Sequence, residues 1–269
     1  MKASRHALVC LLTASFATAL ATPLNAQFWE KKDWRDWSKQ ECEKMLKDSP
    51  WSRRFVSAVF QEGAATVADI NNKMRGETRA ELEYIVQLRS ALPVRQAYIR
   101  LAMIDNKYDK MPADQKKQFD ESAEAFLNQD FSNRVVAHII YTTNLQEIAR
   151  FLAQYWQQSS EQTMPTSGDL IGPKGQRVRP ARYIAPVGGN PELELIYAKQ
   201  MEGAELVSST DRSFSIELPD GPAIVISAPQ GARSDVRMTR TGAGDQTTEP
   251  RVLIQFDPRK MTFKGKLEY

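Results

Sequence analysis

Side chains that could carry nucleophilic or acid–base chemistry are few in this chain of 269 residues. It has two cysteines and two histidines, but His6 and Cys10 lie in the first 26 residues, which we expect to be cleaved. Cys42 and His138 then remain as the single thiol and the single imidazole. A thiol activated by a histidine is a nucleophile for acyl transfer, so the two define a candidate hydrolase dyad. No spacing places them together, and both also fit the interior, because free cysteine is among the most buried residue types.

Charged side chains offer a second kind of chemistry. Glu192 and Glu194 lie two residues apart in an alternating segment, which places them on one face of a strand. Two carboxylates are the usual machinery of glycoside hydrolysis, although exposed strands also carry such charges without any catalysis. Arg177, Arg179 and Arg182 form a basic stretch that fits either an acidic partner or a solvated face. The chain shows no zinc-ligand spacing, P-loop or G-x-S-x-G motif, so the sequence predicts no metal and no cofactor.

Tryptophan is concentrated near the start, at Trp29, Trp34, Trp37 and Trp51. Exposed indole rings anchor protein interfaces, where tryptophan is enriched among the residues that dominate affinity. The same side chains also bury a large apolar area inside a protein. We therefore treat the four tryptophans as candidate binding residues, with core packing as the alternative.

The first 26 residues have the order of a secretory signal peptide. A basic start at residues 1–5 precedes an apolar run over residues 7–20, and small-residue sites allow cleavage after Ala21 or after Ala26. We prefer Ala26, although Ala21 fits the small-x-small rule better. The apolar run is too short to span a bilayer, and no later segment is long and apolar enough. The sequence therefore predicts a periplasmic or extracellular protein without a transmembrane segment in its mature form.

Composition narrows the class of protein. The formal net charge of +3 falls by two, to about +1, when Lys2 and Arg5 leave with the leader. This balance gives no electrostatic reason to expect nucleic acid as a partner. Charged residues make up 26% and hydrophobic residues 42% of the chain, which is ordinary for a folded globular protein.

The first half of the mature chain mixes helical and strand patterns. Ser38-Lys39-Gln40-Glu41 is a capping box that predicts a helix over residues 39–47, with Trp37 placed to pack on Cys42. The segment 135–141 is apolar on both faces, which is typical of a central strand. Further strands are predicted over 54–60 and 82–89, and helices from 93, from 112 and over 144–157.

The second half contains short alternating segments separated by proline and glycine. Strands are predicted over 193–197, 214–218, 224–226, 252–256 and 261–269. We therefore predict an α+β fold, in which an α+β domain at 27–160 precedes a β-rich, sandwich- or barrel-like domain at 161–269, with the boundary near 158–170.

Three blocks of the chain resemble a known group of sequences. They run from Trp37 to Trp51, which includes the E-C pair and D-S-P-W, from Ser90 to Ala97, and from Lys260 to Lys266, which has the pattern K-M-x-F-x-G-K. They are similar to a family of uncharacterised exported bacterial proteins. The resemblance implies export and a shared fold across both predicted domains. It implies no activity, cofactor or catalytic residue.

These observations favour a non-enzymatic exported protein that binds or scaffolds a partner, such as an envelope protein or a polysaccharide. The alternative is an exported hydrolase that uses Cys42 with His138, or a carboxylate pair. A stability or assembly factor for another exported protein is a third interpretation.

Overall fold

The chain folds as an α+β protein, as predicted. The computed structural model describes residues 27–58, 81–144, 146–160, 168–218 and 253–269. The predicted signal peptide (1–26) and the predicted strand at 224–226 lie outside the described residues.

The helices begin close to where the sequence signals place them. The capping box is complete: the Glu41 amide donates to the Ser38 hydroxyl at 3.2 Å, and the Ser38 amide donates to the Glu41 carboxylate at 2.8 Å. Within the described ranges, no helix is both long and apolar enough to cross a bilayer. The α-helices are α1 (Phe28–Lys31), α2 (Lys39–Lys47), α4 (Leu92–Asp105), α5 (Ala113–Leu127) and α6 (Gln146–Gln158), and the 3-10 turns are η1 (Trp34–Asp36), η2 (Tyr108–Lys110) and η3 (Pro258–Lys260).

Five antiparallel strands form the main sheet, in the order β1-β2-β3-β7-β6. They are β1 (Ser52–Ala58), β2 (Glu81–Leu88), β3 (Arg134–Thr143), β7 (Glu192–Ala198) and β6 (Arg182–Ile184). β3 is the central strand, which confirms the prediction from its apolar character on both faces. β6 and β7 come from the segment predicted as a separate β-rich domain, yet β7 pairs with β3 along seven residues. The two predicted halves therefore share one sheet.

A second antiparallel sheet and two hairpins complete the strands. Neither sheet closes into a barrel within the described residues. The continuous strand predicted over 261–269 is wrong, because Lys264 and Gly265 take positive φ angles of 49° and 78° and turn the chain into a hairpin. The second sheet has the order β11 (Leu253–Phe256), β10 (Phe214–Glu217), β4 (Leu170–Ile171) and β5 (Arg177–Val178), and the hairpins are β8 (Gln200–Met201) with β9 (Ala204–Glu205) and β12 (Thr262–Phe263) with β13 (Lys266–Leu267).

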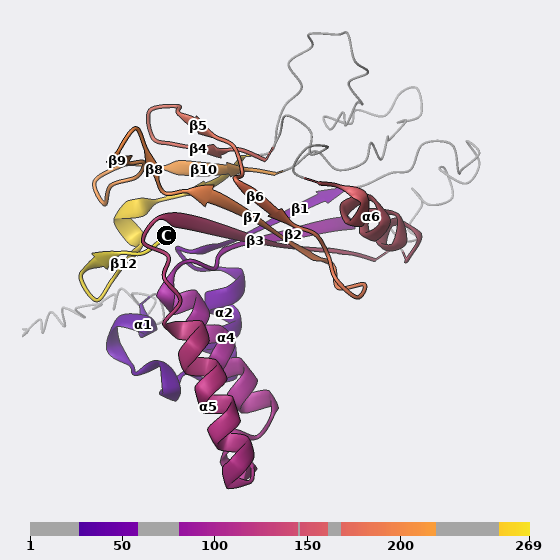
Figure 1. Cartoon of the computed structure of the whole chain (residues 1–269), viewed down its shortest axis with the longest axis vertical. Coiled ribbons are helices and arrows are strands. Elements are labelled where there is room, and N and C mark those ends of the chain that lie inside the picture. Colours follow the sequence, from indigo (N-terminus) through magenta and orange to yellow (C-terminus); the bar gives the residue numbers. More distant parts are fainter. Residues whose placement is uncertain (1–26, 59–80, 145, 161–167, 219–252) are drawn as a thin grey trace, which may run out of the picture.

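The main sheet has two chemically different faces. One face, called the apolar face below, packs against α6 and the second sheet: the Tyr183 hydroxyl donates to the Trp156 carbonyl at 2.6 Å, and the Tyr197 hydroxyl donates to the Gly168 carbonyl at 2.7 Å. The opposite face, called the polar face, carries α2, α4 and α5 below one end of the sheet (Figure 1). The apolar face includes Leu82, Tyr84, Val86, Val135, Ala137, Ile139, Tyr141, Tyr183, Leu193, Leu195 and Tyr197, and the polar face includes Arg54, Val56, Glu83, Gln87, His138, Ile140, Thr142, Glu192 and Glu194.

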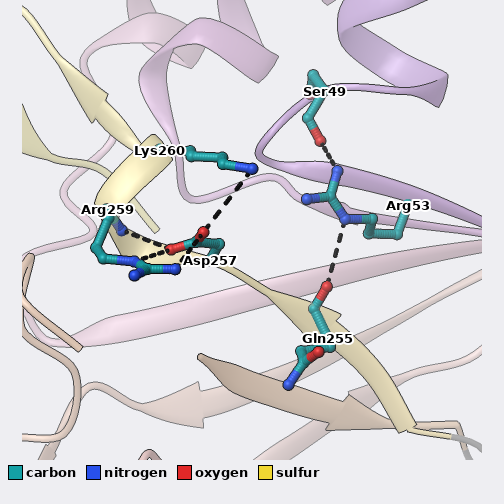
Figure 2. A network of polar contacts seen from close by, with 6 residues as sticks. All are labelled: Ser49, Arg53, Gln255, Asp257, Arg259 and Lys260. Carbon is teal, nitrogen blue, oxygen red and sulfur yellow. Dashed lines mark hydrogen bonds and ion pairs between the residues drawn. The ribbon is translucent and has the colours of Figure 1, made fainter. Parts of the chain in front are cut away.

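A half-buried arginine joins the two sheets at the β1 edge. Arg53 donates to the carbonyl oxygens of Ser49 and, at 3.3 Å, of Gln255 in β11 (Figure 2). Burial lowers the pKa of Arg53, against the opposing influence of Asp48 and Asp257. Beside it, Asp257 binds the Arg259 guanidinium at 2.9 Å (Figure 2). The hydrogen bond from Arg53 to Gln255 thus ties the C-terminal segment to β1.

Candidate functional site

Strand register places polar side chains in one row across the middle of the polar face. Gln87 of β2 pairs with His138 of β3, and His138 pairs with Glu194 of β7. Glu192 lies two residues before Glu194 and faces the same side, as the spacing predicted. The candidate base and the candidate carboxylate pair therefore meet at one place, although they are more than 50 residues apart in sequence.

His138 is enclosed by carboxylates. Its side chain is 4% exposed, with Nε2 at 3.3 Å from Oε2 of Glu192 and Nδ1 at 3.4 Å from Oε1 of Glu194. Nδ1 lies within ion-pair distance but makes no hydrogen bond of acceptable geometry. The ring meets the Tyr98 ring edge-on, with the two centroids 6.2 Å apart. His138 is thus buried, as the core interpretation expects, but in a polar setting.

Glu194 is held between His138 and Arg89. The Arg89 guanidinium forms an ion pair with Oε1 of Glu194 and also lies over the rings of Tyr98 and Phe126. Burial alone would raise the pKa of Glu194, but the close contact with His138 and the Arg89 charge together outweigh burial and hold this pKa below its ordinary value. Glu194 is therefore a charged group at neutral pH.

Gln87 fastens two helices to this part of the sheet. Its amide nitrogen donates to the Leu46 carbonyl of α2 at 2.6 Å, and its amide oxygen accepts from the Tyr98 hydroxyl of α4. Burial raises the pKa of Tyr98 to about 12, so its hydroxyl remains a donor at neutral pH. The row of polar groups is consequently covered at this end.

The other end of the polar face reaches solvent. Arg54, Val56 and Thr142 are exposed there, and the Glu192 side chain is 45% exposed. Arg54 donates to Glu83 across β1 and β2 at 2.6 Å. This open end of the sheet presents charges of both signs beside a surface valine, and Glu192 connects it to the enclosed His138.

The arrangement is suited to proton transfer and to ionic contacts. Imidazole gains and loses protons near neutral pH in water, and carboxylates on both sides can accept its N–H groups. Metal binding has no comparable support, because no group of three His, Cys, Asp or Glu side chains in the described part is placed to hold an ion.

Cys42 lies in the buried stripe of α2 and is 0% exposed. Burial raises the pKa of its thiol to about 12, so the reactive thiolate is scarce at neutral pH. No hydrogen bond joins Cys42 to His138 in the described part of the chain. The geometry that a thiol–imidazole dyad needs is therefore not formed here.

The tryptophans mostly fill the interior. Trp29, Trp37 and Trp51 are 6%, 0% and 0% exposed, and the Trp51 ring meets Trp29 edge-on at 5.6 Å between centroids. The Trp51 indole also donates to the Glu268 carbonyl at 2.8 Å, which anchors the C-terminal end. Trp34 alone among the four is half-buried, with the Arg35 guanidinium over its ring. Core packing accounts for the three buried rings.

Sequence reasoning did not identify Arg89 and Tyr98 as parts of the site. The alternation of Gln87 and Arg89 with apolar residues was an available signal, because it places both on the polar face. Tyr98 had no such signal: its position in α4 faces the sheet only after long-range packing.

The basic stretch divides between two roles. Arg177 has a side chain that is 44% exposed, and it binds the buried carboxylates of Asp169 at 2.8 Å and Glu217 at 2.7 Å in the second sheet. Arg179 and Arg182 are exposed. All three arginines therefore reach the surface, but the charge of Arg177 is paired with two buried carboxylates.

Comparisons of the chain with protein-family models, with curated proteins and with solved structures find no match. The site must be interpreted from its own geometry.

Proposed function

We propose that this protein is exported and binds or scaffolds a partner, an envelope protein or a polysaccharide, without catalysing a reaction. The leader-like residues 1–26 and the resemblance to exported bacterial proteins support export to the periplasm or beyond. N-terminal sequencing of protein recovered outside the inner membrane tests this part. A start at residue 22 or 27 fits the proposal, and an intact Met1 in a cytosolic fraction contradicts it.

The distribution of reactive groups carries the binding proposal. The thiol of Cys42 is buried, and the imidazole of His138 is enclosed by Glu192 and Glu194. What remains accessible on the polar face is an open end of mixed apolar and charged character, which includes Arg54 and Val56. Such a mixture is typical of protein surfaces that form non-obligate interfaces.

Retention experiments test this surface. The protein without residues 1–26 is immobilised and exposed to envelope proteins and to cell-wall polysaccharides, alongside the variant R54E/V56D. The matched control is V187D, because Val187 is 74% exposed and lies in the loop between β6 and β7, outside the strands of the main sheet. We expect wild type and V187D to retain the same partner and R54E/V56D to lose it. Equal retention by all three proteins, or no retention by wild type, contradicts the proposal.

A carboxylate-dependent hydrolase is the second candidate, and one observation favours it. Glu192 is half exposed and contacts His138, so a carboxylate with an imidazole behind it reaches solvent. A screen of glycoside and ester substrates with wild type and E192Q tests this function. Turnover that E192Q abolishes would establish it, whereas turnover that survives E192Q, or its complete absence, excludes Glu192 as a catalyst.

A further inference from the structure

His138 is placed for a form of imidazole that carries both protons. Neutral imidazole has a single N–H, so only one ring nitrogen can donate. Both nitrogens of His138 nevertheless lie within ion-pair distance of carboxylate oxygens, Nε2 at 3.3 Å from Glu192 and Nδ1 at 3.4 Å from Glu194, although the Nδ1 contact does not meet hydrogen-bond geometry. In the neutral form, one of these contacts sets two acceptors against each other inside the protein, which is unfavourable.

The charges around the ring balance only when it is protonated. From β7, Glu192 and Glu194 face His138, and Arg89, after β2, pairs with Glu194. From α4, the Tyr98 ring packs nearly perpendicular to the His138 ring, and the Tyr98 hydroxyl donates to Gln87. Among the described residues, the ion-pair partner of Glu192 is His138 alone. Arg89 and imidazolium together match the two carboxylates, whereas loss of the proton leaves one negative charge without a partner.

We propose that His138 is a proton-responsive latch, which in its doubly protonated form ties Glu192 and Glu194 of β7 to the central strand and releases one of them when the proton leaves. The proton passes to solvent beside Glu192, the half-exposed end of the row. Acidification therefore tightens the attachment of β7 and removes a net negative charge from the open end of the polar face. The latch does not depend on the proposed binding function, because it follows from the contacts of His138 alone.

Nuclear magnetic resonance can observe this imidazole without overlap, because the chain without residues 1–26 contains one histidine, His138. Both ring nitrogens are followed from pH 8.5 to pH 5 in wild type, E192Q and E194Q. The matched control is E83Q, since Glu83 lies on the same face and pairs with Arg54 rather than with His138. We expect the titration midpoint to fall in E192Q and E194Q and to match wild type in E83Q, because an opposite charge nearby favours the charged form.

Hydrogen exchange supplies the structural readout. After correction for intrinsic exchange, opening of residues 192–198 in wild type should decrease on acidification from pH 8 to pH 5.5, because the doubly protonated ring holds both carboxylates of β7. E192Q should show a smaller decrease. A midpoint that is the same in all four proteins, or β7 opening that is independent of pH in wild type, overturns the latch. E192Q keeps the test decisive, because this side chain is half exposed and its replacement leaves the interior intact.

Discussion

The two faces of the main sheet use the same strands for different purposes. On β3, Ala137, Ile139 and Tyr141 are buried against the other layer, whereas His138 and Thr142 of the alternate set belong to the polar face. The apolar face joins the sheet to α6 and the second sheet, and the polar face carries His138 with Glu192 and Glu194. A strand whose two faces are covered to different extents can thus hold a fold together on one side and present chemistry on the other.

Thiol chemistry gives the largest expected effect, and it tests whether the covered end of the polar face is as dry as the apolar face. A rise of the Cys42 pKa from 9.0 to about 12 reduces the thiolate about a thousandfold near neutral pH. We expect a thiol reagent at pH 8 to leave the folded protein unmodified and to label Cys42 in denaturant. Rapid labelling of the native protein would show that α2 does not seal this end, and it would revive the Cys42 hydrolase.

A pair of truncations on the two faces gives the next largest effect. Leu195, on the apolar face, is 0% exposed, so L195A should lower the free energy of unfolding by about 2–5 kcal/mol. Val56, at the open end, is 40% exposed, so V56A should change it by about 0.5 kcal/mol or less. Urea titrations followed by circular dichroism measure both values. Similar losses in the two variants would remove the distinction between the faces.

Acid sensitivity sharpens the comparison further. Because the pKa of Glu194 is held below its ordinary 4.5, the folded state favours its charged form. Its contribution is therefore present above about pH 4.5 and is lost as pH falls through the lowered pKa. We expect E194Q to lower the free energy of unfolding by roughly 1.5–3 kcal/mol at pH 7, which is the range for hydrogen bonds to charged groups. In acid, the free energies of unfolding of E194Q and wild type should converge. Urea titrations at several pH values measure this difference in the free energy of unfolding. A difference that stays constant from pH 7 to pH 3 would argue against the ionic role of Glu194.

The smallest effect concerns the start of α2, which covers the polar face. S38A removes the hydroxyl that caps the Glu41 amide and should lower the free energy of unfolding by about 1 kcal/mol. S38D is the control, because aspartate also caps helices and should retain most of the stability. Thermal unfolding of wild type, S38A and S38D measures the three stabilities. If capping matters, only S38A should be destabilised, whereas a requirement for serine itself would destabilise both variants equally.

Local signals in the sequence predicted the parts of this fold that depend on neighbouring residues. The capping box at Ser38 and Glu41 fixed the start of α2, and alternation placed Glu192 and Glu194 on one face. Pairing between distant segments carried no local signal. The contact of Arg89 with Glu194 spans 105 residues and exists because β7 inserts beside β3. The predicted boundary near 158–170 follows a real change in composition, yet the chain continues into the same sheet.

The final hairpin shows a different limit. Alternation from Met261 to Leu267 is compatible with one strand, and only the positive φ angles at Lys264 and Gly265 divide it. Glycine favours such angles, but a single glycine is also compatible with a bulge or a close backbone approach. The tryptophan cluster was equally ambiguous, because enrichment is the same whether the rings line an interface or fill a core.

Hydrogen–deuterium exchange, measured with and without the retained partner, tests the division between the two faces most directly. We predict that the partner slows exchange in the strands of the open end, β1, β2 and β7, and leaves the tryptophan-rich segment 27–51 unchanged. Protection confined to residues 27–51, or to the second sheet, would contradict the account, because the open end of the polar face would then have no part in binding.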